Sequence, residues 1–178
     1  SGATRRYDGS VHAATGLLSL GGVLAGDSAS LSGNAVLASK NVGAQAISGL
    51  GTLSLDNANY TLNGVLPSGS VAVTALPINV AAIGGAQKEY DGSVAAGANL
   101  LEVSNVVSGD TLVLGGSMNL AGKDAGSQAI SGIAGVTLSD SNYTVTGATA
   151  SGTVLVTPRA LSVQAASGAT RRYDGSVH

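Results

Sequence analysis

Hydrophobic and polar residues alternate in several short segments of the chain. Residues 69–74 have the sequence Gly-Ser-Val-Ala-Val-Thr, and residues 152–157 have the sequence Gly-Thr-Val-Leu-Val-Thr. Side chains two positions apart lie on the same face of a β-strand, so the two valines of each segment can line a core. The same kind of pattern predicts strands at residues 52–55, 76–80 and 160–163.

Turn-forming residues separate these segments. Tyr-Asp-Gly-Ser, Asn-Gly, Gly-Gly and Ser-Gly-Asp are typical of places where a chain reverses direction. The alanine-rich residues 81–86 contain two adjacent glycines and make a poor helix, while a short helical turn near residues 11–20 or 94–101 is compatible with the pattern. The chain has 27 Gly, no Phe and no Trp, and its polar residues are mainly Ser, Thr and Asn. This composition favours an all-β fold with a thin aliphatic core.

The sequence repeats itself. Residues 1–12 and 167–178 are both SGATRRYDGSVH, and Tyr-Asp-Gly also begins at Tyr90, so this motif recurs in steps of 83 residues. Other motifs keep the same step: Gly26-Asp27 and Gly109-Asp110, Lys40 and Lys123, Gln-Ala-Ile-Ser-Gly at 45–49 and 128–132, and Asn-Tyr-Thr at 59–61 and 142–144. This period matches a small independent domain better than a solenoid repeat. We therefore expect one 83-residue module in two alternating versions, taken from a longer tandem array.

Proline marks the expected boundaries between modules. Pro77 and Pro158 each follow a valine-rich strand, where a stiff link without a backbone donor suits a junction. We predict a first module in residues 1–75 that lacks its opening strand, a second in residues 76–158, and the opening segment of a third in residues 159–178. We expect small β-sandwich or β-grasp-like modules of 83 residues, arranged end to end in an elongated rod.

Charge and composition exclude several classes of function. The formal net charge of −2 provides no electrostatic footprint for nucleic acid or for an anionic membrane surface. No apolar run reaches the length of a membrane span. Cysteine is absent, which excludes disulfides and thiolate metal sites.

The order of the repeated motifs resembles the YDG/MBG-type repeat of large bacterial exoproteins similar to filamentous haemagglutinin. The motifs are Tyr-Asp-Gly-Ser, Gly-Asp, Lys-Asn-Val-Gly or Lys-Asp-Ala-Gly, Asn-Tyr-Thr, and a valine-rich strand followed by Pro. Together they cover essentially the whole chain. The resemblance implies a secreted or surface-held adhesin, often exported by two-partner secretion and tied to biofilm formation, and it supplies no catalytic residues.

Tyrosine and aspartate each allow two interpretations. All five tyrosines lie in repeated motifs; tyrosines can stack on sugars, but recurrence at a fixed step favours a core role in which the hydroxyl finds a polar partner. Aspartates in loops can bind calcium, which takes about six to eight oxygen ligands. Their spacing matches no EF-hand or nonapeptide calcium pattern, and Asp beside Gly is ordinary turn chemistry. We expect no cofactor and no metal site, with calcium as the alternative.

Four residues are candidates for contacts with a ligand or a glycan. Arg5 and Arg6 form a basic pair that the alternate module replaces with Lys-Glu. Such a pair either contacts an acidic polysaccharide or forms a solvated edge that discourages sheet aggregation. Asn59 and Asn142 lie in the only two Asn-x-Ser/Thr sequons, and each either accepts a glycan or shapes a bend.

No catalytic residues are predicted. His12 and its copy His178 occupy one repeat position that the alternate module fills with alanine, and no nucleophile–base–orienter set can be assembled. We therefore expect a structural stalk repeat of a secreted or cell-surface bacterial adhesin that takes part in adhesion and the biofilm matrix. The alternative is a repeated carbohydrate-binding module that contacts polysaccharide directly.

The expected partners are neighbouring repeat modules and, in the alternative, an extracellular polysaccharide; neither nucleic acid nor a membrane is expected. The segment 159–178 is predicted to carry a strand whose partners lie outside this chain. Leu161–Ala165 should then be poorly packed on its own chain or complete the first module of a neighbour by strand exchange.

Overall fold

The computed structural model describes residues 2–65 and 67–176, and these residues form an all-β fold, as predicted. The helical elements within these ranges are two 3₁₀ turns of three residues, Thr15–Leu17 and Ala98–Leu100. Both lie in the segments where the sequence was compatible with a short helical turn. In the described part of the chain, no helix has the length and apolar character needed to cross a bilayer.

Among the described residues, the first seven strands pair with one another, and we call residues 4–74 the N-terminal strand group. Five of its strands form a sheet in the order β1-β7-β5-β4-β2, in which β1 and β7 are parallel and the other neighbours antiparallel. β3 and β6 form a separate antiparallel pair. The bounds are β1 Thr4–Arg6, β2 His12–Ala14, β3 Leu31–Ser32, β4 Asn34–Leu37, β5 Gly43–Gly49, β6 Ser54–Leu55 and β7 Ser70–Thr74.

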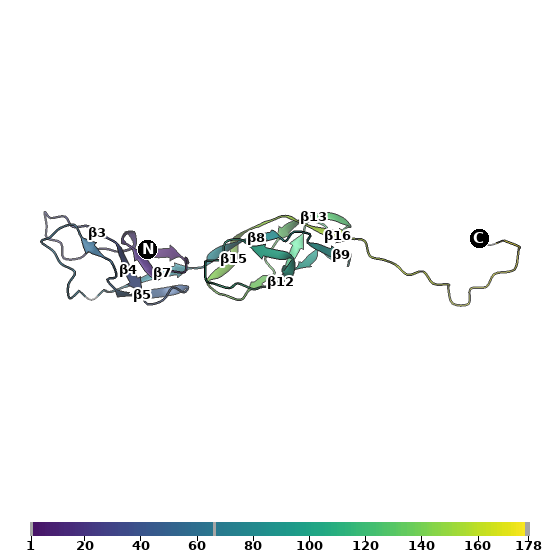
Figure 1. The fold of residues 1–178 in the computed structure, drawn as a ribbon, viewed down its shortest axis with the longest axis horizontal. Helices are drawn as coiled ribbons and strands as arrows, with labels where there is room; N and C mark the ends of the chain where they lie inside the picture. Colours follow the sequence, from purple (N-terminus) through teal and green to yellow (C-terminus); the bar gives the residue numbers. More distant parts are fainter. Residues whose placement is uncertain (1, 66, 177–178) are drawn as a thin grey trace.

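The remaining strands form the C-terminal strand group, residues 76–157. One sheet has the order β10-β12-β13-β16-β9, with β14 paired to another part of β12, and a second sheet has the order β11-β8-β15. Figure 1 shows both groups. The bounds are β8 Leu76–Ala82, β9 Gln87–Glu89, β10 Ala95–Gly97, β11 Leu101–Val103, β12 Leu114–Leu120, β13 Gly126–Gly132, β14 Val136–Leu138, β15 Tyr143–Ser151 and β16 Thr153–Thr157.

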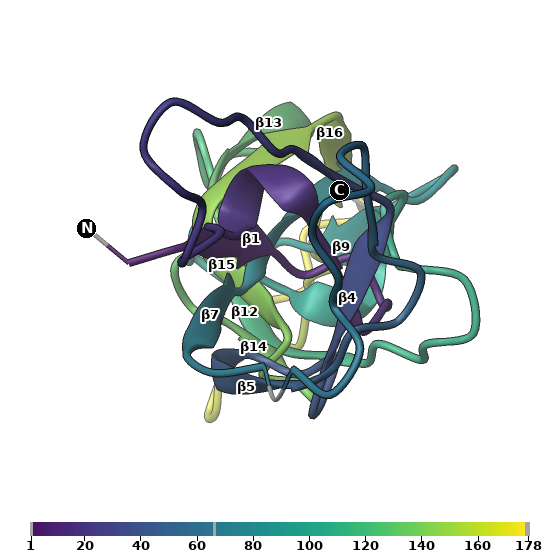
Figure 2. The ribbon, with the colours of Figure 1, turned by 90° about the vertical axis from the view of Figure 1, so that its left-hand side faces the viewer.

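The 83-residue sequence repeat is also a repeat of strand register. Arg5 lies opposite Val73 in the β1–β7 pair, and Lys88 lies opposite Val156 in the β9–β16 pair. The pairs β2–β4, β4–β5 and β5–β7 recur in the same way as β10–β12, β12–β13 and β13–β16. β4 and β12 share an irregular register at equivalent positions, and such irregularities strengthen twist. The sheets accordingly curl, as the end view of the N-terminal strand group shows (Figure 2).

β8 distinguishes the two strand groups. It pairs parallel to β15 and antiparallel to β11, and its Ile78 and Val80 are buried. The described part of the N-terminal strand group has no counterpart of β8. Residues 18–20 and 60–65, which correspond to β11 and to the first part of β15, are not in strands. The absence of the partner strand explains why these segments lack ladder pairing.

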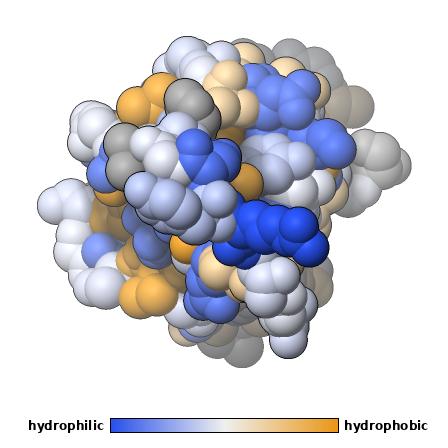
Figure 3. All heavy atoms as spheres, turned by 90° about the vertical axis from the view of Figure 1, so that its right-hand side faces the viewer, coloured by the Kyte–Doolittle hydropathy of each residue, from blue (hydrophilic) through white to orange (hydrophobic). Residues whose placement is uncertain are grey.

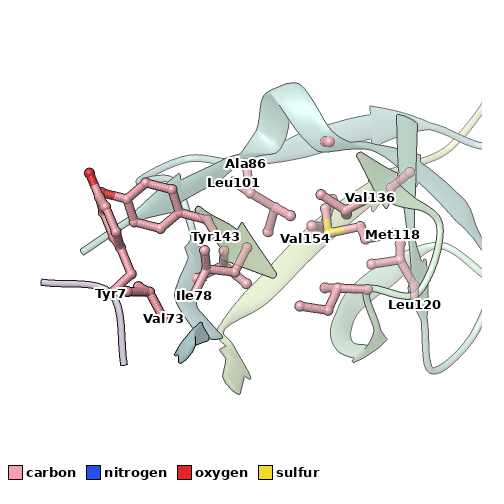
Figure 4. Packing of buried hydrophobic residues seen from close by; sticks show 14 of the residues in the cluster. Tyr7, Val73, Ile78, Ala86, Leu101, Met118, Leu120, Val136, Tyr143 and Val154 are labelled. Atoms are coloured by element: carbon pink, nitrogen blue, oxygen red, sulfur yellow. The ribbon is translucent and has the colours of Figure 1, made fainter. Parts of the chain in front are cut away.

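The core is built from the alternating positions that the sequence predicted. Val71 and Val73 of β7 are buried, as are Val154 and Val156 of β16, while their neighbours on the other face are more exposed. Figure 4 shows Ile78, Met118, Leu120 and Val154 converging in the C-terminal strand group. The predicted strands at residues 52–55 and 76–80 correspond to β6 and β8.

The predicted strand at residues 160–163 does not form. Residues 159–176 contain no strand, and Leu161 and Val163 are 87% and 97% exposed. Figure 1 shows this segment extending away from the sheets beyond β16. Its alternation is that of a strand, but no sheet edge in this chain receives it. The prediction that Leu161–Ala165 is poorly packed on its own chain is therefore confirmed.

Candidate functional site

Each Tyr-Asp-Gly motif forms the same turn. Asp8 accepts a hydrogen bond from the Ser10 N–H at 2.9 Å, and Asp91 accepts one from the Ser93 N–H at the same distance. Gly9 has φ +78°, in the left-handed region that favours glycine. The aspartates therefore act as turn residues, which is the structural one of their two interpretations.

A cation closes each turn. Arg5 donates to the Asp8 carboxylate and to the Ser10 carbonyl, and Lys88 takes the same role at Asp91. The Lys88 ammonium and the Ser93 N–H hold the pKa of Asp91 below its usual range. Arg5, a candidate ligand contact, is thus mostly buried and bonded within the turn, whereas Arg6 is exposed.

Tyr7 links the two strand groups. Its side chain is 2% exposed, and its hydroxyl donates to Asp110 Oδ2 at 2.6 Å. Its ring meets the ring of Tyr143 edge to face, with centroids 5.6 Å apart and planes at 71° (Figure 4). This is a favourable geometry for two aromatic rings. Tyr7 comes from the motif after β1, and Tyr143 begins β15, so the contact joins elements of different groups.

Asp110 is the polar centre of this contact. Besides the Tyr7 hydroxyl, it accepts the Tyr143 hydroxyl at 2.8 Å and the Lys40 ammonium at 2.9 Å. The hydrogen bonds from Tyr7, Lys40 and Tyr143 lower the pKa of Asp110 to about 2. Burial raises the pKa of Tyr143 to about 12. The Lys40 ammonium also lies 5.8 Å from the centroid of the Tyr7 ring.

Asn142 provides a second polar contact between the groups. Its Oδ1 accepts the Val42 N–H at 2.8 Å, and its Nδ2 donates to Asn41 Oδ1 at 3.1 Å. Asn142 is buried, so this sequon asparagine is already occupied by protein contacts. A glycan on Asn142 would require these bonds to open. The other sequon residue, Asn59, is exposed.

Glycine allows the two groups to approach closely here. A Cβ on Gly9 would lie 2.5 Å from Val107 Cγ1, closer than real Cβ atoms come to a neighbour. The equivalent Gly92 has nothing within 4 Å of such a Cβ. Gly9 is therefore required both for its turn and for the contact. We call the set Tyr7, Gly9, Lys40, Asn41, Val42, Val107, Asp110, Asn142 and Tyr143 the junction.

Each half of the junction is present a second time without a partner. Tyr60 donates to Asp27 Oδ2 at 2.7 Å and accepts the Leu24 N–H at 3.0 Å, which reproduces the bonds of Tyr143 to Asp110 and Val107. Yet Asp27 and Leu24 are exposed and Tyr60 is half-buried. We call Leu24, Asp27, Asn59 and Tyr60 the acceptor half-site, and it lies 83 residues before its partnered copy.

The donor half also recurs. Tyr90 and Lys123 are the counterparts of Tyr7 and Lys40. Tyr90 is half-buried and Lys123 is exposed, whereas Tyr7 is fully buried. We call these two residues the donor half-site. Since the same residue types are more buried where the halves meet, the junction itself causes the difference.

The four candidate contact residues do not gather into one site. Arg5 lies in a turn, Asn142 in the junction, and Arg6 and Asn59 at the surface, and within the described residues no hydrogen bond or ion pair joins any two of them. Across these same ranges, no three His, Cys, Asp or Glu side chains are grouped so that they could hold a metal ion.

The sequence contained the junction residues without indicating that they meet. Lys40 and Asp110 were noted as repeated positions, but a repeat does not show which copy of one motif contacts which copy of another. The signal that could have found them is the pairing of a repeated cation with a repeated anion on opposite ends of the module. Both columns have the same 83-residue step.

Comparison with known families gives one match. The family model described as YDG domain matches residues 1–67 and 74–151. No curated protein and no solved structure matches the chain.

Proposed function

The chain belongs to the YDG domain family, and from that premise we propose that it is a structural stalk repeat of a secreted or cell-surface bacterial adhesin. In this proposal the two 83-residue units are small β-sandwich or β-grasp-like modules placed end to end in an elongated rod. The rod would hold an adhesive region away from the cell or span a biofilm matrix. Its work is mechanical and requires no active site.

The observation that carries the proposal is the junction. A carboxylate that receives three donors, two tyrosine rings at van der Waals contact and an asparagine that bonds two backbone-linked groups together fix one module against the next. Since the same residue types stand at both outer ends, successive modules can use the same contact. A stalk needs such a repeatable, directional joint.

The connection between the modules is also short. β7 ends at Thr74 and β8 begins at Leu76, so Ala75 alone lies between a strand of one module and a strand of the next. One residue leaves little freedom for reorientation, unlike a flexible linker. The short link and the junction together favour a stiff rod over a string of independent domains.

Small-angle X-ray scattering can test the proposal. We would compare this chain with a longer protein in which two copies of residues 1–166 are joined in one polypeptide, both at high dilution. A stalk predicts that the maximum dimension nearly doubles while the cross-section stays constant. A compact particle, or a broad distribution of dimensions, would contradict it.

The carbohydrate-binding alternative has a separate test. Arg6 and Asn59 are exposed and available to a polysaccharide. Glycan-array binding by the intact chain, lost in Arg6→Ala but retained in Glu89→Ala at the equivalent position, would favour this alternative. A uniformly negative array would leave the stalk proposal in place.

A further inference from the structure

The N-terminal strand group contains an unfilled apolar cavity. Its volume is about 290 Å³, and its wall includes Leu18, Leu20 and Tyr60. The residues 83 positions later are Leu101, Val103 and Tyr143. All three of these later residues lie opposite residues of β8 in the C-terminal strand group. The cavity therefore lies where a strand equivalent to β8 would pack.

The cavity is not wholly due to a missing strand. Ala35 lines it, and the equivalent residue in the C-terminal strand group is the much larger Met118. Its wall nevertheless includes backbone segments 18–20 and 60–62, which are free of ladder pairing. A ligand for this site must offer both apolar side chains and backbone hydrogen bonds, which is what an extended peptide supplies.

The same chain carries such a peptide. Leu161 and Val163 are 87% and 97% exposed, and they follow Ile78 and Val80, which are 0% and 3% exposed, by 83 residues. An alternating segment with two large exposed apolar side chains is a strand without a sheet. Burying each of these side chains is worth about 1.5–3 kcal/mol.

We propose that residues 159–165 of one copy of this chain insert into the cavity of a second copy, so that copies assemble head to tail. The incoming strand lies antiparallel to residues 18–20 and parallel to residues 60–62, as β8 lies against β11 and β15. Shifting the β8 register by 83 residues places Val163 opposite Leu20 and Ala165 opposite Leu18. Leu161 and Val163 then enter the apolar cavity.

The half-sites meet in the same assembly. The insertion brings the end of one C-terminal strand group to the start of the next N-terminal strand group, as β8 does within the chain. The donor half-site, Tyr90 and Lys123, then faces the acceptor half-site around Asp27 and Tyr60. The acceptor hydrogen bonds are already formed in the unpartnered chain, at 2.7 Å and 3.0 Å, so this surface needs little reorganisation.

The repeated dodecamer makes the exchange neutral in its remaining contacts. Beyond the inserted strand, the incoming chain continues as SGATRRYDGSVH, the sequence with which the receiving copy begins. Either segment can therefore supply the strand equivalent to β1 without loss of side-chain contacts. The exchange is a domain swap whose net gain is the filled cavity and the new junction. Because the two surfaces differ, the contact is heterologous and leads to open chains.

Sedimentation velocity of the intact chain over a range of concentrations tests the inference. We expect a series of oligomers whose mean mass rises with concentration. Val163→Asp should weaken this association by at least about tenfold, because it places a charge in the cavity and loses the buried valine. Its circular dichroism and melting temperature should stay those of the wild type, since Val163 is exposed in the unassociated chain.

Ser162→Asp is the matched control, because Ser162 is equivalent to the exposed Asn79 on the other face of the strand. It should retain association. A synthetic peptide of residues 159–166 should dissociate the oligomers and bind one per chain. A wild-type chain that stays monomeric to about 1 mM, a closed dimer, or a Val163→Asp protein that associates normally would each overturn the inference. None of these results would affect the stalk proposal, which is tested on a covalently joined chain.

Discussion

The hydroxyl of Tyr7 and the carboxylate of Asp110 lie 2.6 Å apart, although 103 residues separate them in the sequence. Tyr7 belongs to the Tyr-Asp-Gly turn of one strand group and Asp110 to the Gly-Asp motif of the other. Two of the repeated motifs are thus the two sides of one contact. The repeats preserve the geometry of this joint as well as that of the module.

Replacing Asp110 by alanine should destabilise the C-terminal strand group and loosen the junction. Three donors would lose their acceptor, and the Tyr7 hydroxyl would be left buried, which together should cost roughly 2–4 kcal/mol. Asp27→Ala at the unpartnered acceptor half-site removes one exposed bond to Tyr60 and should cost at most about 1 kcal/mol. Urea denaturation of both variants measures the difference. Equal losses would mean that Asp110 acts only within its own module.

Stability should fall in acid more steeply in the wild type than in Asp110→Asn. Hydrogen bonds from Tyr7, Lys40 and Tyr143 lower the pKa of Asp110 in the folded chain from 3.8 to about 2. A carboxyl with a lowered folded pKa contributes stability above its unfolded pKa, and that contribution disappears as the pH falls from about 4 to 2. Melting temperatures of the two proteins across this range test the prediction. Asp8 and Asp91 are present in both, so their contribution cancels.

Two of the tyrosines should ionise late. Burial raises the pKa of Tyr143 to about 12, and burial and the nearby Asp110 carboxylate raise that of Tyr7. Groups with a raised folded pKa stabilise the fold below their unfolded pKa of 10.0 and lose this contribution as the pH rises through the folded value. A spectrophotometric titration should show a late phase that Tyr143→Phe reduces and Tyr173→Phe leaves unchanged. Tyr173 is almost fully exposed.

Gly9→Ala and Gly92→Ala should differ in cost. Both positions have positive φ, near +78°, which an alanine adopts at a cost of about 1–2 kcal/mol. At Gly9 the added Cβ also meets Val107, so the junction must shift and the total should reach about 2–4 kcal/mol. Chemical denaturation measures both variants. Similar values would show that the close approach at Gly9 is easily relieved.

Short-range pattern predicted much of the fold. The alternation around Val71 and Val154 gave core strands with the correct inward face, and the Tyr-Asp-Gly motifs gave the turns. These features depend on neighbouring residues only. The strand at residues 160–163 was predicted for the same reason and was wrong for this chain, because a strand also needs a partner, and pairing is a long-range property.

The junction could not be predicted from pattern. Asn142 was considered as a glycan acceptor and Arg5 as a ligand contact, since an exposed loop is the usual place for both residue types. Asn142 is buried because the two strand groups meet over it, and Arg5 is occupied because its own turn folds back on it. Both outcomes depend on how distant segments pack, and a single sequence does not encode that distance directly.

Ala75 has a mechanical consequence. Because it is the only residue between β7 and β8, tension applied to the two ends of the chain passes along the backbone from one strand straight into the next. The contacts of Tyr7, Lys40 and Asn142 lie beside this path rather than on it. They are therefore spared axial load and resist bending and torsion, so that a stretched chain would yield inside its sheets before its joint parted.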